Sequence, residues 1–127
     1  MAYTNVVFSS YAMVDIVSPE DPVLALFRVS NRELEARVTL PTKDADGQPL
    51  TGMTELNIGI LKEVIFSENP FATVLPENLV TFAESHGGQS STIFLTESDA
   101  GQLKACRFAG LQVNSVYWVA VVVKDES

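Results

Sequence analysis

The stretch that decides the fold is FAGLQVNSVYWVAVVVKDES, residues 108–127. It predicts a turn followed by a β-strand, because the side chains of a strand alternate between two faces. One face carries Tyr117, Val119, Val121 and Val123, and the other carries Trp118, Ala120 and Val122. Both faces are apolar, so each needs a covering layer. Because the sequence ends at Ser127, we expect these layers to come from segments before this strand or from another chain.

Composition predicts one globular domain. The chain has 127 residues, of which 46% are hydrophobic and 19% charged, enough to bury a core. The chain has eight Lys and Arg and sixteen Asp and Glu, so its net charge is −8. This charge disfavours binding to nucleic acid or to anionic membranes. Residues 1–20 lack a basic leader and a long apolar run, which predicts neither a signal peptide nor a membrane span.

Alternation upstream predicts further strands. Leu34, Ala36 and Val38 would share a buried face, while Glu35 and Arg37 would face solvent. Similar β-rich runs, separated by turn residues, cover 4–17, 22–30, 34–40, 54–66, 91–96, 102–111 and 115–123. Seven or eight short strands of this kind are typical of an all-β sandwich.

An insert of mixed character follows the run that ends at Phe66. Pro76 at a first helical turn and Gly87 at the far end favour a short helix between them. The alternation of Val80 and Phe82 favours a strand instead. We give preference to the helix.

Two segments resemble a known family. Gly110 and Leu111, followed by a short turn and by Tyr117, resemble the end of a fibronectin type III domain. Residues 36–60, with their Asp-Gly loop, resemble strand B, the loop and strand C of bacterial and phage-borne versions. The resemblance spans roughly 34–124 without the insert. It implies a tyrosine corner at Tyr117 and Leu111, in which the tyrosine hydroxyl bonds to the backbone a few residues upstream.

The sequence departs from this family at three points. Val38 stands where a tryptophan is common, Val113 replaces a proline, and the last strand of the family, strand G, is missing. The resemblance therefore implies an immunoglobulin-like, fibronectin type III-like β-sandwich over 34–127, without strand G, and an N-terminal β-rich extension over 1–33.

The missing strand would leave the strand that begins at Tyr117 with a bare edge, which soluble proteins avoid. Either the N-terminal segment folds back to pair with it, or a neighbouring subunit donates a strand. We favour the first, because the chain itself contains a suitable β-rich segment. The residues predicted as a candidate assembly edge are Trp118, Ala120 and Val122.

Catalytic patterns are weak in this sequence. His86 is the only histidine and follows Ser85, but a lone loop histidine is ordinarily a turn or helix-end residue, and a triad is recognised only by geometry. Cys106 alternates with apolar neighbours, which predicts a core thiol. The Asp-Ala-Asp-Gly segment 44–47 lacks the other ligands of a calcium loop and predicts a turn. We therefore expect no enzyme activity, metal or cofactor.

These observations predict a non-enzymatic structural or interaction protein of a large assembly. A chain that starts at Met1 without an export signal, with a fold usually displayed outside cells, suits a tailed-phage virion: a capsid decoration or tail-associated protein made in the host cytoplasm and released by lysis. Its partners would be other virion subunits or itself. The alternative is a carbohydrate-binding or adhesion module, which needs clustered aromatic side chains, but the sequence has one Trp and three Tyr.

Overall fold

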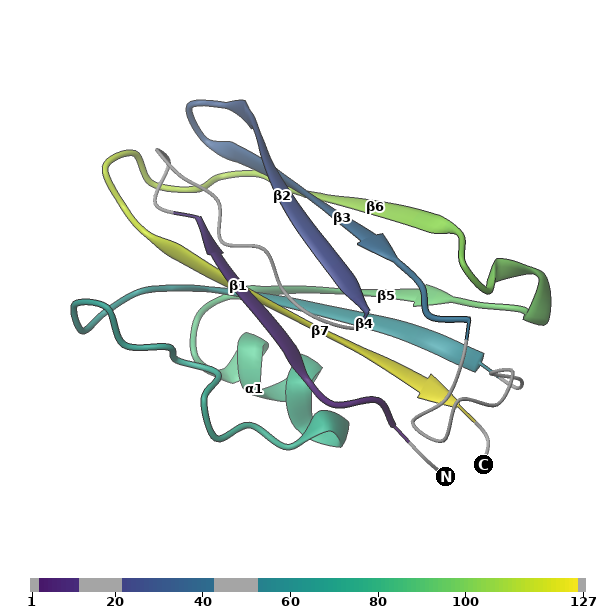
Figure 1. Cartoon of the computed structure of the whole chain (residues 1–127). Helices are drawn as coiled ribbons and strands as arrows, with labels where there is room; N and C mark the ends of the chain where they lie inside the picture. Colours follow the sequence, from purple (N-terminus) through teal and green to yellow (C-terminus); the bar gives the residue numbers. More distant parts are fainter. Residues whose placement is uncertain (1–2, 12–21, 43–52, 126–127) are drawn as a thin grey trace.

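The computed structural model describes residues 3–11, 22–42 and 53–125, where two antiparallel sheets pack face to face and a short helix covers one of them (Figure 1). The first sheet has the order β1-β7-β4-β5, formed by Val7–Tyr11, Tyr117–Asp125, Met53–Lys62 and Gln89–Phe94. The second has the order β2-β3-β6, formed by Val23–Ser30, Glu33–Thr39 and Leu103–Phe108. Helix α1 is Leu79–Ser85, and the 3-10 turns η1 and η2 are Pro76–Asn78 and Glu97–Asp99. The predicted all-β sandwich is confirmed at this level.

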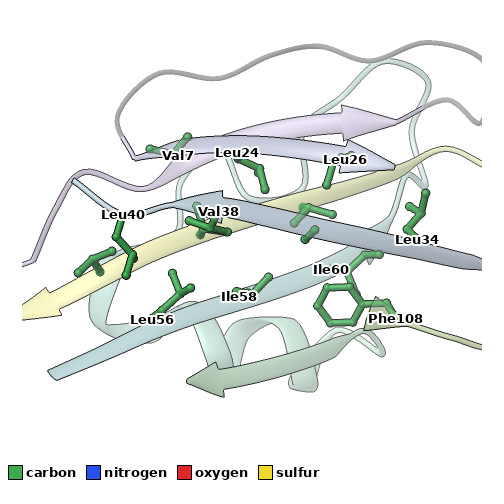
Figure 2. Packing of buried hydrophobic residues seen from close by; sticks show 14 of the residues in the cluster. Val7, Leu24, Leu26, Leu34, Val38, Leu40, Leu56, Ile58, Ile60 and Phe108 are labelled. Atoms are coloured by element: carbon green, nitrogen blue, oxygen red, sulfur yellow. The ribbon is translucent and has the colours of Figure 1, made fainter. Parts of the chain in front are cut away.

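The main core lies between the two sheets (Figure 2). Leu34, Ala36 and Val38 of β3 are fully buried, as their alternation predicts. They face the apolar side chains of the first sheet, among them Ile58 and Ile60 of β4. Burial of each large aliphatic side chain contributes about 1.5–3 kcal/mol, so this layer is the main source of stability.

Strand β7 is covered on both faces. Val119, Val121 and Val123 belong to the core between the sheets. Ala120 and Val122 point the other way, into a second cluster that includes Leu79 and Ala83 of α1. The insert therefore supplies the second covering layer that the apolar strand requires.

The insert forms the predicted short helix. Pro76 lies at the start of η1, α1 follows directly, and Gly87 ends the turn with a φ of 81°. Gly59 of β4 lets the helix come close to the sheet: a Cβ placed there would lie 3.0 Å from the Cβ of Ala83. A larger residue at position 59 would push the helix away from the strand.

The N-terminal segment covers the edge of β7. Strand β1 pairs with β7 in antiparallel register, with Val7 opposite Val121 and Ser9 opposite Val119. The favoured arrangement, in which the chain covers its own edge, is confirmed. The described residues of the range 1–33, predicted as an extension, contribute one strand to each sheet, and Val7 and Leu24 lie in the same core as Leu34.

Some predictions fall outside the described residues. These are the Asp-Gly turn at 44–47 and most of the proline-bearing turn before β2. The β-rich run predicted over 54–66 is too long for the strand it forms, because β4 ends at Lys62 and the chain turns at Phe66 and Ser67.

Deleting residues 1–17 tests the role of β1. We expect the truncated protein to aggregate or form new oligomers, because the backbone edge of β7 and part of the core lose their cover. Light scattering on both proteins measures this. In the full-length protein the amides of β7 should be among the slowest to exchange with solvent. Rapid exchange throughout Tyr117–Val123 would contradict the pairing.

Candidate functional site

The only histidine contacts the end of its own helix. The ring of His86 stacks on Phe82 with centroids 4.1 Å apart, and its Nδ1 lies 2.9 Å from the carbonyl oxygen of Phe82 and 3.1 Å from Oγ of Ser85. This geometry accounts for the Ser85–His86 pair as a helix-end contact. Cys106 is half-buried and packs against the main core, as predicted.

Within the described ranges, no group of three or more His, Cys, Asp or Glu side chains could hold a metal ion. In the same ranges, no helix has the length and apolar character needed to cross a membrane.

Tyr117 makes a backbone hydrogen bond near the end of the sandwich. The backbone N–H of Gln112 donates to its hydroxyl oxygen at 2.7 Å. Leu111 is buried, and its N–H donates to the carbonyl oxygen of Arg32 at 3.0 Å. The upstream contact that the tyrosine corner implies is thus present, with the hydroxyl accepting from a backbone donor.

Two of the three residues predicted as a candidate assembly edge lie inside the molecule. Ala120 and Val122 are fully buried beneath α1, and Trp118 packs at the margin of the same cluster. Ala120 and Val122 therefore offer no surface to a partner, whereas Trp118 is only partly buried. The prediction for Ala120 and Val122 failed because the sequence did not show that the insert folds over this face of β7.

A different apolar group is exposed. The side chains of Val64, Ile65 and Phe66, which we call the apolar tip, are 90%, 62% and 92% exposed. The tip follows β4 after one residue, Glu63, and lies at the same end of the sandwich as the loop before β7 (Figure 1). Three consecutive large apolar residues at such exposure are unusual, because single exposed apolar side chains are the norm on a monomer surface.

Glu63 holds the apolar tip in a fixed turn. Its Oε1 accepts from the backbone N–H of Ser67 at 2.6 Å, and its Oε2 accepts from the indole Nε1 of Trp118 at 2.7 Å. The backbone N–H of Glu63 also donates to the carbonyl oxygen of Val116 at 2.8 Å. Ser67 takes a positive φ of 59°, which lets the chain reverse direction. One carboxylate therefore links both ends of the tip to the strand that organises the fold.

The sequence contains a feature that indicates this exposed turn, but the β-rich run before it led us to extend the strand through it. Glu63 interrupts the apolar run before Val64, and a Ser-Glu-Asn-Pro turn follows Phe66. An apolar triplet between a carboxylate and a turn is typical of an exposed loop as well as of a strand end. The exposure of the tip and its bonds to Glu63 emerged only from the tertiary structure.

The outer face of the three-stranded sheet is charged and internally paired. Hydrogen bonds from Arg37 and then Arg107 lower the pKa of Glu35 below its usual value. A carboxylate with a lowered pKa stabilises the fold above the usual pKa, and that contribution is lost as pH falls through the lowered one. The guanidinium of Arg37 also lies 4.1 Å from the ring centroid of Phe27. These groups satisfy one another, so the apolar tip remains the stronger candidate for a binding site.

A scan against protein-family models found no matching family, and searches of curated proteins and of solved structures found no match.

Replacing Tyr117 with Phe tests the hydrogen bond at the sandwich end. We expect Tyr117→Phe to lower the free energy of unfolding by about 1 kcal/mol, because the ring still packs while the N–H of Gln112 loses its acceptor. Denaturant melts should show a lower midpoint with an unchanged slope. A midpoint equal to that of the wild type would show that this hydrogen bond does not stabilise the corner.

Replacing Glu63 with Ala tests the anchor of the apolar tip. Trp118 is the only tryptophan, so its fluorescence reports directly on this contact. We expect Glu63→Ala to shift the emission to longer wavelength and to lower stability by about 1 kcal/mol or more, because the indole and the N–H of Ser67 lose a charged acceptor. The control is Glu68→Ala, an exposed glutamate in the same turn, which should leave the emission unchanged.

Proposed function

We propose that this protein is a non-enzymatic interaction protein of a large assembly, most plausibly a capsid decoration or tail-associated component of a tailed-phage virion. The observation that carries the proposal is the apolar tip, three exposed apolar side chains on a turn anchored by Glu63. Burying a Val, Ile or Phe side chain at an interface contributes about 1.5–3 kcal/mol each. Because the turn is already ordered, little conformational entropy is lost on binding.

The size of the apolar tip favours a repeated assembly over an isolated pair of proteins. Three side chains bury much less than the roughly 1,000 Å² that a stable one-to-one interface needs. When many copies bind to a symmetric lattice, weak individual contacts combine through multivalency. A virion surface provides this repetition, and the net charge of −8 suits binding to protein better than binding to nucleic acid.

The strand order supports an immunoglobulin-like, fibronectin type III-like sandwich. Such folds place strands C, F and G in one sheet and strands A, B and E in the other. On the alignment of the two resembling segments, β4 and β7 correspond to C and F, and β3 corresponds to B. Strand β1 then lies beside β7 at the position that strand G occupies in those folds. The phage proposal is supported by the resemblance of these segments to phage-borne versions of that domain and by a fold that is usually displayed outside cells.

The carbohydrate-binding alternative gains no support from the geometry. The exposed phenylalanines in the described ranges are Phe27, Phe66 and Phe94, which lie on β2, the tip and β5. They lie on three different elements, whereas a sugar platform needs its aromatic rings together on one face.

Analysis of purified particles tests the proposed function. We expect mass spectrometry of gradient-purified phage particles from the strain that encodes the chain to detect it as a stoichiometric component. Substituting Ile65 and Phe66 with Ser should reduce its incorporation at least tenfold, the effect of about 1.4 kcal/mol of lost contact energy. Val29→Ser, an exposed apolar residue of the other sheet, is the matched control and should incorporate normally. Particles that lack the chain altogether would refute the assignment.

A further inference from the structure

Strand β5 is an edge strand without the usual protection. In the described part of the chain it has a neighbour, β4, on one side only. Its sequence, Gln-Ser-Ser-Thr-Ile-Phe, carries no charge and no proline, and its register with β4 is regular. Edge strands normally carry charges, prolines or bulges that prevent pairing with another chain.

The other edge strands differ from β5. Strand β6 carries Lys104 and Arg107, and β2 carries Arg28 beside a register shift between Arg28 and Ser30. Strand β1 contacts β2 of the opposite sheet, which closes that side of the sandwich. Strand β5 is therefore neutral and regular, and among the described residues no strand lies beside its outer edge.

The pattern of hydrogen bonds between β4 and β5 shows which backbone groups of β5 point away from β4. The N–H of Leu95 donates to the carbonyl oxygen of Thr54 at 2.9 Å, so residue 95 forms a hydrogen-bonded pair with β4. In an antiparallel ladder such pairs alternate with pairs whose backbone groups point away. The N–H and C=O groups of Ser90, Thr92 and Phe94 consequently face outward from the sheet.

The apolar end of the same edge is also exposed. Phe94 is 80% exposed, on the face of the sheet that α1 covers further along the strand. Its neighbour Ile93 points to the opposite face and packs against the main core. An aromatic ring and three pairs of outward backbone groups thus lie together on one six-residue strand.

We infer that β5 pairs with β5 of a second copy of this chain, antiparallel and about a two-fold axis at Thr92. Outward residues must face outward residues, so Thr92 lies opposite Thr92 of the second copy, and Ser90 opposite Phe94. This register forms about six backbone hydrogen bonds, two for each pair of residues. It joins the two four-stranded sheets into one continuous sheet and places each Phe94 on the neighbouring copy's β5.

The neutrality of β5 makes this edge suitable for a second copy of the chain. In a two-fold contact each residue near the axis meets its own counterpart, so a charged strand would place like charges opposite one another. Strands β2 and β6 would do so through Arg28, Lys104 and Arg107. Strand β5 itself carries no charged side chain, so no charge of this strand meets its own counterpart at the axis, and Glu84 lies beside its outer part, where it accepts a hydrogen bond from Ser90 at 2.6 Å. Paired threonines at the axis are a favourable cross-strand combination.

The test is the oligomeric state of the full-length protein. We expect analytical ultracentrifugation at micromolar concentration to give twice the monomer mass for the wild type. Thr92→Lys should shift the dissociation constant at least tenfold toward the monomer, because it places two ammonium groups opposite each other at the axis. The matched control is Ala105→Lys, an exposed outward position on β6, which should remain dimeric. Thr92 also donates a hydrogen bond to Oδ1 of Asn57 at 2.9 Å, and Thr92→Lys removes it. Circular dichroism should therefore be used to verify that this variant remains folded.

A second substitution locates the axis independently. Antiparallel hydrogen-bonded partners have Cα atoms about 5.5 Å apart, and their Cβ atoms are slightly too far apart for an unstrained disulfide. A short bismaleimide should therefore cross-link Thr92→Cys into a covalent dimer, whereas Ala105→Cys and the wild type, with its half-buried Cys106, should not be cross-linked. A monomeric wild type, or a Thr92→Cys protein that does not cross-link, overturns the inference. The result is independent of the apolar tip, because Ile65 and Phe66 substituted with Ser should leave the dimer intact.

Discussion

The structure depends on a strand that is apolar on both faces. Strand β7 can be stable in water only if a layer covers each side, because exposed Val, Trp and Tyr side chains and an unpaired backbone edge all carry a free-energy cost. The chain meets this constraint with three different segments. The second sheet covers one face, helix α1 covers the other, and β1 pairs with the edge.

The insert 67–88 covers one face of β7, and the turn before it exposes the apolar tip. Helix α1 approaches β4 closely because Gly59 has no side chain, and this brings Leu79 and Ala83 onto β7. In the turn before the insert, Glu63 accepts a hydrogen bond from Trp118, which lies on the face of β7 that α1 covers. The apolar tip is therefore anchored to the strand on which the rest of the sandwich is built.

The two proposed contact surfaces lie at different places on the sandwich. The apolar tip lies at the end where Tyr117 and the loop before it are found, while β5 forms a lateral edge of the four-stranded sheet. A dimer through β5 therefore leaves the tip of each copy available, and it presents two tips on one particle. Such a bivalent unit would bind a repeating surface more strongly than a single copy.

The sequence by itself determined the local elements. Alternation in β3, the apolar run of β7 and the Pro76 and Gly87 signals predicted two strands and a helix, because these depend on local periodicity and backbone preference. It also predicted that Tyr117 bonds to upstream backbone. Only the tertiary structure decided that β1 lies beside β7, that Ala120 and Val122 are buried, and that Val64–Phe66 are exposed. An apolar residue looks the same in the sequence whether it is buried in a core or exposed on a turn. Whether it is buried depends on segments that are distant in the sequence.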